Sequence, residues 1–193
     1  MKLTLRHLLI FLLLAAISVG FGLGFDTVAT AMEKHAYPCP EEFQADIAAN
    51  AAEFGIPEAI LWGFIHTQSD FSSNKVGADG SIGLSQLTPE EFEMIRTSIL
   101  KEDAQSADML YAPKTSLRYG AAYLSFLYHR YGVWETAFAA YEAGTETVDA
   151  WLLDSSLTDE NGNLVTVPDA DVAAIAEKTT SACEYYQRLY YSS

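Results

Sequence analysis

The chain of 193 residues has little cysteine and little histidine, and both shortages exclude classes of protein. Two cysteines and four histidines are present, and none of them follow the spacings that hold zinc. Neither a metal site nor a scaffold built on many disulfides is expected, and no cofactor is predicted. Half of the residues are hydrophobic, which is enough to form a buried core.

Positive charge is also scarce. Lys and Arg number 11 against 26 Asp and Glu, so the formal net charge is −15, and in residues 32–193 the imbalance is 9 against 25. Nucleic-acid binding depends on cations that neutralise phosphates, so a nucleic-acid partner is excluded. Neutral glycan strands or cationic groups suit such a surface better as ligands, although the charge can also serve solubility alone.

Only one long hydrophobic run is present, from Leu8 to Phe25, and two basic residues precede it. Its length reaches that of a membrane span, which favours a signal anchor in residues 1–31 with a transmembrane helix at about residues 8–25. Cleavage after Ala31, which would release a secreted form, is the alternative. In both cases the rest of the chain lies outside the cytoplasm.

A linker at residues 32–39 and a domain at residues 40–193 follow this segment. The two cysteines, Cys39 and Cys183, lie near the two ends of that domain. An oxidising compartment permits a disulfide between them, but the sequence does not show whether the ends meet in space. The disulfide is left open here.

The domain is expected to be all-α, because hydrophobic residues recur at helical spacing. Asn161 and Gly162 predict a small hairpin within residues 154–168. Thr88, Pro89 and Glu91 form a capping-box pattern that starts a helix. Helices are expected at residues 40–54, from Pro57 to the Gln68 region, 88–100, 113–131, 134–143, 146–153 and 169–190, with a loop at 101–112.

Gln68 is placed on the apolar face of its helix with Ile60 and Phe64, at a spacing of four residues. A polar side chain at the inner end of a core helix requires a reason to be there. The sequence around it, IHTQSDF followed by GADGSIGLSQLTP, is one of two informative stretches. The other runs from 113 to 152 and contains RYG, WETA and AYEAG in that order.

Together these stretches resemble the bacterial lytic transglycosylases of the SLT type, which have a lysozyme-like fold. The resemblance implies peptidoglycan glycan strands as the substrate, cleaved at the β-1,4 bond between N-acetylmuramic acid and N-acetylglucosamine. It also implies that one Glu acts as acid and then as base and leaves a 1,6-anhydro end. A bacterial cell envelope is implied only through the family.

The resemblance places that Glu at residue 68, where this chain has Gln, and an amide cannot donate a catalytic proton. The chain also has Ser85 where the family has Met and Glu142 where it has Asn. The family's Tyr near the last helix has no counterpart in residues 168–174. Four departures together favour drift away from catalysis.

The resemblance assigns substrate contacts to a group of cleft residues, namely Ser69, Gly83, Leu84, Ser85, Gln86 and Tyr141. Glu142 is a candidate for a relocated acid, although a solvated helix residue is the simpler interpretation. Asp70 and Asp79 are interpreted as turn residues. The histidines His35, His66 and His129 are interpreted as structural or exposed.

Three hypotheses remain. The first is an anchored domain that binds peptidoglycan and is weak or inactive as an enzyme. The second is an active transglycosylase that uses Glu142. The third is an envelope scaffold that binds a protein partner and has lost the glycan cleft.

Overall fold

The computed structural model describes residues 40–191, with the side chains of the last helix described to residue 188. Helices make up the domain, and no strand occurs in that range. In chain order they are α2 (Glu41–Phe54), α3 (Glu58–Ser69), α4 (Pro89–Met94), the π-helix η1 (Ile95–Leu100), the 3-10 helix η2 (Ala107–Tyr111), α5 (Pro113–Tyr131), α6 (Trp134–Ala143), α7 (Thr145–Leu152) and α8 (Ala170–Tyr191). The expected all-α class is confirmed.

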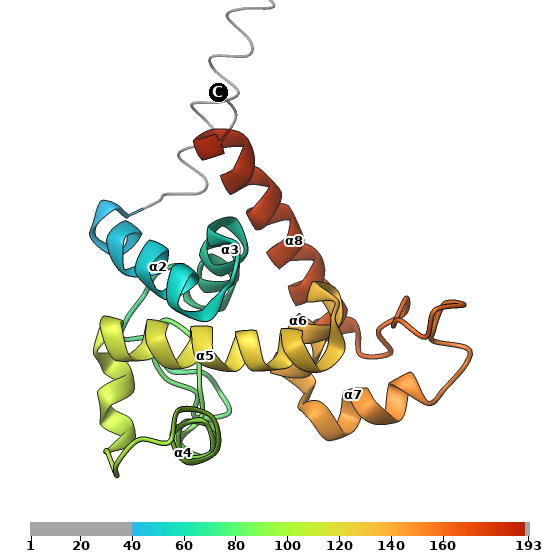
Figure 1. Ribbon diagram of the computed structural model, residues 1–193, viewed down its shortest axis with the longest axis horizontal. Helices are drawn as coiled ribbons and strands as arrows, with labels where there is room; N and C mark the ends of the chain where they lie inside the picture. Colours follow the sequence, from blue (N-terminus) through green and yellow to red (C-terminus); the bar gives the residue numbers. More distant parts are fainter. Residues whose placement is uncertain (1–39, 192–193) are drawn as a thin grey trace, which may run out of the picture. The chain divides into compact units, whose positions relative to one another are not determined.

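Helix α3 is the central element of the core. Its side chains Leu61, Trp62, Phe64 and Ile65 are almost completely buried. It packs mainly against α8, and α5 runs across the domain beside α2 and α6 (Figure 1). The two helices approach each other closely at Gly63, where an added Cβ would lie 2.7 Å from the main-chain nitrogen of Cys183.

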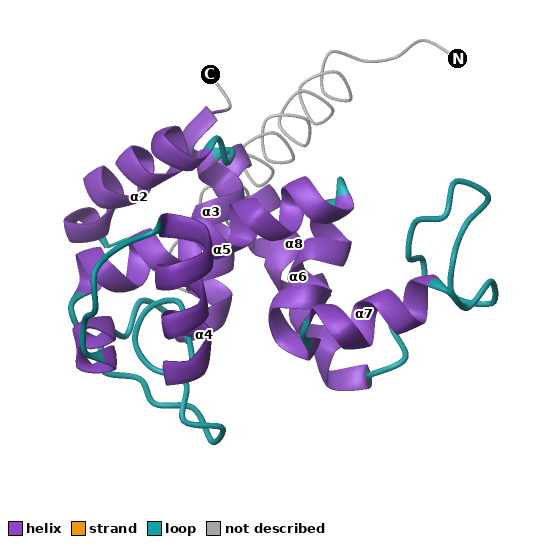
Figure 2. Ribbon diagram, turned by 60° about the horizontal axis from the view of Figure 1, so that its bottom comes forward, coloured by secondary structure: helices purple, strands orange, loops and turns teal. Residues whose placement is uncertain are grey.

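Several boundaries differ from the sequence-based prediction. Pro57 is the N-cap of α3 and not its first residue, because its ψ of 131° is extended. The predicted helix at 88–100 is α-helical only to Met94 and continues as the π-helix η1. The predicted loop at 101–112 contains η2. The predicted hairpin is reduced to one antiparallel bridge between Thr158 and Leu164. This bridge lies in the loop that follows α7 and projects away from the helices (Figure 2).

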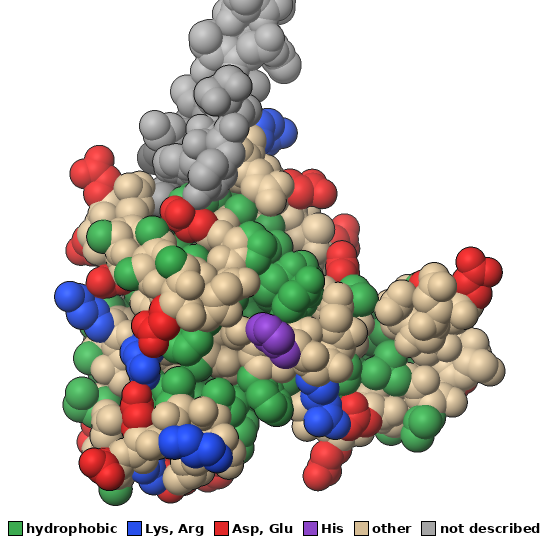
Figure 3. Space-filling view, in the orientation of Figure 1, with side chains coloured by type: hydrophobic (Ala, Val, Ile, Leu, Met, Phe, Trp, Pro, Cys, Tyr) green, Lys and Arg blue, Asp and Glu red, His purple; other side chains and the backbone are tan. Residues whose placement is uncertain are grey.

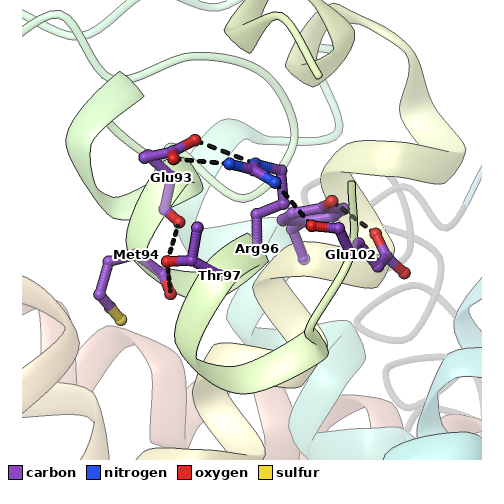
Figure 4. Close-up of polar contacts among 6 residues, drawn as sticks. Glu93, Met94, Arg96, Thr97 and Glu102 are labelled. Atoms are coloured by element: carbon purple, nitrogen blue, oxygen red, sulfur yellow. Dashed lines mark hydrogen bonds and ion pairs between the residues drawn. The ribbon is translucent and has the colours of Figure 1, made fainter. Parts of the chain in front are cut away.

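The π-helix has a polar anchor (Figure 4). The Arg96 guanidinium donates two hydrogen bonds to the Glu93 carboxylate, at 2.9 and 2.6 Å, and one to the main-chain oxygen of Glu102 at 2.6 Å. Thr97 donates to the main-chain oxygen of Glu93 at 2.8 Å. These bonds connect the first turn of η1 to α4 and to the segment that follows η1.

The N-terminal predictions lie outside the described residues: the anchor in residues 1–31, its span at about 8–25, the linker at 32–39 and His35. Among residues that the structure describes, none of the helices has the length and hydrophobicity that crossing a membrane requires. On the face shown in Figure 3, hydrophobic side chains gather near the centre and acidic side chains lie mainly toward the edges.

Candidate functional site

A polar pocket of about 250 Å³ lies where α3, the loop after it, α4, α6 and α8 meet. Its lining combines residues that are far apart in the sequence. The described lining residues are Thr67, Gln68, Lys75, Gly77, Asp79, Ser81, Gln86, Glu91, Tyr141, Glu142 and Ile175. Four of the predicted site residues are therefore brought together here, namely Gln68, Gln86, Tyr141 and Glu142.

The loop between α3 and α4 forms one wall. It begins with two consecutive residues in the left-handed region, Asp70 (φ 50°) and Phe71 (φ 59°), which end α3. Two antiparallel bridges, from Ile82 to Val76 and to Leu87, fold the loop back on itself. Hydrogen bonds from the main-chain and side-chain groups of Ser81 to Asp79, at 3.1 and 2.7 Å, fix the turn and lower the pKa of Asp79. The predicted turn role of Asp79 agrees with this geometry.

Gln68 lies in the last turn of α3 and is 8% exposed. Its side-chain amide donates a hydrogen bond to the carboxylate of Glu142, near the end of α6. Its main-chain oxygen accepts a hydrogen bond from the Lys75 ammonium. The resemblance assigns the acid to residue 68. The amide found there is thus paired with a carboxyl group 74 residues away in the sequence.

Burial is the largest influence on Glu142 and raises the pKa of its carboxyl group. The hydrogen bond from Gln68 acts in the opposite direction. The carboxylates of Glu91 and Asp79 raise the pKa further, and Lys75 lowers it. The environment of Glu142 therefore favours the protonated form of its carboxyl group, and this carboxyl group is also the one that is hydrogen-bonded to Gln68.

Glu91 is a second carboxyl group in the pocket. Its carboxylate accepts hydrogen bonds from the Thr88 main-chain nitrogen and hydroxyl at 2.8 and 2.9 Å, and its own nitrogen donates to the Thr88 hydroxyl at 3.2 Å. The predicted capping box is confirmed. Burial raises the pKa of Glu91, partly offset by the Thr88 bonds. The sequence identified Glu91 only as a cap, and no pattern in the sequence marked it as a residue of the pocket.

Gln86 and Tyr141 line the pocket but use their donors to hold the loop. Gln86 adopts a left-handed conformation (φ 48°), and its amide nitrogen donates to the main-chain oxygens of Gly83 at 2.8 Å and Lys75 at 3.2 Å. The Tyr141 hydroxyl donates to the main-chain oxygen of Ser85 at 2.9 Å. Burial raises the pKa of Tyr141 well above its ordinary value, so it stays protonated.

Four predicted substrate-binding residues do not line the pocket: Ser69, Gly83, Leu84 and Ser85. Ser69 donates to Ile65 within α3 at 3.2 Å, and Leu84 is a fully buried core residue. Ser85 is also fully buried, and its hydroxyl donates to the main-chain oxygen of Ser116 at 2.7 Å. Ser69 thus belongs to the end of α3, and Leu84 and Ser85 form the buried side of the loop that follows it.

The remaining predicted residues lie elsewhere. His66 is buried against the Trp62 ring and lies 3.4 Å from the Asp70 carboxylate, and His129 contacts the Ser125 carbonyl at 2.7 Å. Cys183 is a buried free thiol 3.7 Å from the Ile60 carbonyl. Cys39 lies outside the described residues, so the disulfide stays a prediction. Residues 40–191 contain no cluster of three or more potential metal ligands.

Comparison with known proteins agrees with this architecture. The family model described as the transglycosylase SLT domain matches residues 46–162, more than half of the chain. No curated protein sequence matches the chain.

Solved structures give the same result. The lytic transglycosylase Slt of Pseudomonas aeruginosa, solved as an inactive variant, is 26% identical with a TM-score of 0.68 over 81% of this chain. The 70-kDa soluble lytic transglycosylase of Escherichia coli is 20% identical with a TM-score of 0.71 over 80% of this chain. A 70-kDa soluble lytic transglycosylase in complex with bulgecin A is 20% identical with a TM-score of 0.73 over 83%.

The chain spans about a quarter of the length of these neighbours, at 25%, 25% and 26%. The shared part is the lysozyme-like fold described above. With the family model and the neighbours in agreement, the chain belongs to the transglycosylase SLT domain family.

Proposed function

We propose that this domain binds peptidoglycan glycan strands in the pocket between α3, α4 and α6, and that it cleaves them weakly or not at all. The observation that carries the proposal is the pairing of Gln68 with Glu142 inside that pocket. The family supplies the substrate class, and the pairing supplies the reason for weak chemistry. An amide at residue 68 can donate a hydrogen bond to a sugar but has no proton to transfer.

The loss of the acid should be costly. General acid–base catalysis contributes roughly 10²–10⁴-fold to a rate, and in this mechanism one residue performs both steps. The Pseudomonas aeruginosa relative is an inactive variant in which Gln replaces one Glu. This supports the same consequence for Gln68 here.

A second candidate is cleavage with Glu142 as the acid, and one specific observation favours it. Where the family has Glu and Asn, this chain has Gln68 and Glu142, so the hydrogen-bonded pair still holds one carboxyl group and one amide. The raised pKa of Glu142 suits a proton donor. However, the carboxyl group is displaced by a hydrogen-bond length, and misplacement by about 1 Å can cost 10²-fold in rate.

The test uses the full chain in a mild detergent, incubated with purified peptidoglycan. Co-sedimentation with the insoluble wall measures binding, and mass spectrometry for 1,6-anhydro-muropeptides measures cleavage. We expect co-sedimentation with few or no anhydro products. Bulgecin A, which one neighbour binds, is expected to reduce the co-sedimentation if this pocket is the binding site.

Two outcomes decide between the hypotheses. Abundant anhydro products that disappear in Glu142→Gln would assign the acid role to Glu142 and reject the weak-enzyme proposal. Absence of both binding and products would reject the glycan function and favour a scaffold for an envelope protein partner. Glu41→Gln, at the exposed start of α2, is the matched control for the loss of one carboxylate.

We also propose that the domain faces the cell wall from a membrane anchor at about residues 8–25. The uncharged run from Leu8 to Phe25 supports this proposal. Alkaline extraction of membranes from the producing cells, followed by N-terminal sequencing, is the test. If the protein is released into the soluble fraction and its N-terminus follows Ala31, the segment is a cleaved signal peptide and the anchor proposal is rejected.

A further inference from the structure

The pocket carries more negative charge than neutral glycan binding requires. Three carboxyl groups line it, those of Asp79, Glu91 and Glu142, and among the described lining residues Lys75 is the basic one. The Lys75 ammonium is already engaged by the main-chain oxygen of Gln68. The other described lining side chains are uncharged, so the pocket has an excess of two negative charges when its carboxyl groups are ionised.

The three carboxyl groups lie close enough to influence one another. Asp79 raises the pKa of both Glu91 and Glu142, and Glu91 raises that of Glu142. They come from three separate elements: the loop after α3, the first turn of α4, and the end of α6. Their mutual repulsion in a partly buried site is reduced by a bound cation.

An acetamido group is neutral and offers one N–H donor, whereas a free amino group on the same sugar is a cation with three donors. Hydrogen bonds between an ammonium and a carboxylate are shorter and stronger than those between neutral groups. A hexosamine that has lost its acetyl group therefore matches the charge of this pocket better than the acetylated sugar.

We infer that the pocket prefers glycan strands that carry free amino groups, that is, de-N-acetylated hexosamines, over fully acetylated strands. This inference rests on the proposed glycan binding and names its substrate class more narrowly. The preference comes from Asp79, Glu91 and Glu142 together, while Lys75 opposes it.

The test compares two tetrasaccharides, the β-1,4-linked tetramers of glucosamine and of N-acetylglucosamine. Binding to the full chain in mild detergent is measured by calorimetry at about pH 6. Asp79 is ionised there because its pKa is lowered, and a bound ammonium favours the ionised forms of Glu91 and Glu142, whose pKa values are raised. The glucosamine tetramer is expected to bind about tenfold more tightly, which corresponds to about 1.4 kcal/mol. The preference is expected to shrink as salt is added, since exposed charges are screened.

Variants give effects of opposite sign. Glu142→Gln and Asp79→Asn are each expected to lower the preference for the glucosamine tetramer, and Lys75→Met is expected to raise it. If Lys75 had only a structural role, Lys75→Met would not tighten the binding of the glucosamine tetramer while leaving that of the acetylated tetramer unchanged. Glu41→Gln, which removes a carboxylate outside the pocket, is expected to leave the ratio of the two affinities unchanged.

The outcomes separate this inference from the proposed function. Equal binding of both tetramers, or tighter binding of the acetylated one, overturns the inference and leaves glycan binding intact. Binding of neither tetramer overturns both. A peptide amine is the other possible source of an ammonium group, so a lysine-containing tetrapeptide is added as a competitor. If the tetrapeptide displaces the glucosamine tetramer at equal concentration, the pocket is assigned to a peptide amine and the inference is overturned.

Discussion

The side chain of Gln68, at the end of α3, donates a hydrogen bond to the carboxylate of Glu142, at the end of α6. The sequence resemblance places the family's Glu and Asn at these two positions. On that assignment, the pair exchanges the location of its carboxyl group and its amide and keeps one of each. The carboxyl group of the pair then lies on α6 and not on α3.

The first prediction concerns the stability cost of Glu142. Its pKa is raised by burial, so the folded state holds the proton more tightly than the unfolded state. The group therefore lowers stability as the pH rises from its ordinary value of 4.5 through the raised value. Glu142→Gln removes this cost and can still accept the bond from Gln68, so its melting temperature should exceed that of the original protein at about pH 7.

Thermal unfolding of both proteins across a pH series measures this difference. The gain of the variant is expected to shrink as the pH falls and to vanish below 4.5, where the carboxyl group becomes protonated in both states. A variant that is less stable at about pH 7, or a gain that grows on acidification, would contradict the described environment of Glu142.

The second prediction concerns the crossing of α3 and α8. A Cβ at Gly63 would lie 2.4 Å from the Cys183 sulfur and 2.7 Å from its main-chain nitrogen. The side chain can move but the nitrogen moves only with α8, so Gly63→Ala should lower the free energy of unfolding by about 1–3 kcal/mol. Urea denaturation measures the loss. Adding Cys183→Ala should not restore stability, and full recovery would show that the sulfur alone causes the clash.

The third prediction concerns the cap of α4. Thr88 supplies a hydroxyl to the Glu91 nitrogen at 3.2 Å and is the N-cap of the helix. Thr88→Ala should cost about 1 kcal/mol of stability, in the range of roughly 0.5–2 for such caps. Ser98→Ala, at an exposed position of η1, is the control for the loss of a hydroxyl and should cost no more than about 0.5 kcal/mol. Equal losses in the two variants would contradict the capping role.

The fourth prediction concerns Cys183. Burial raises the pKa of its thiol to about 12, so the reactive thiolate is scarce at neutral pH. Alkylation of the native protein followed by peptide mass spectrometry should find Cys183 unmodified, and unfolding should expose it. Rapid labelling in the native state would contradict its burial. The same digest without reductant reports whether Cys183 is joined to Cys39.

Local patterns in the sequence predicted much of the fold. Hydrophobic spacing identified the long helices, and Thr88, Pro89 and Glu91 correctly marked the start of α4. Asn161 and Gly162 marked the reversal at which Gly162 adopts φ 79°. These features depend on residues that are neighbours in the chain, so the sequence alone contains the information.

Features that depend on particular side-chain pairings were not predicted. The π-helix η1 has Arg96 bound to Glu93 and to the main-chain oxygen of Glu102, a combination that helical periodicity does not reveal. The pairing of Gln68 with Glu142 joins residues 74 apart. The resemblance assigns Ser85 to substrate contact, which stays a prediction, but its full burial and its bonds to Ser116 were not foreseen.

The central claim is that the amide at residue 68 limits cleavage in a pocket that still binds glycan. The most direct test is the double variant Gln68→Glu with Glu142→Asn, which introduces the pair that the resemblance implies for the family. It is compared with the original protein for release of 1,6-anhydro-muropeptides from peptidoglycan. The account predicts a rise of about 10²-fold or more. An unchanged yield from a double variant that still co-sediments with the wall would contradict the claim.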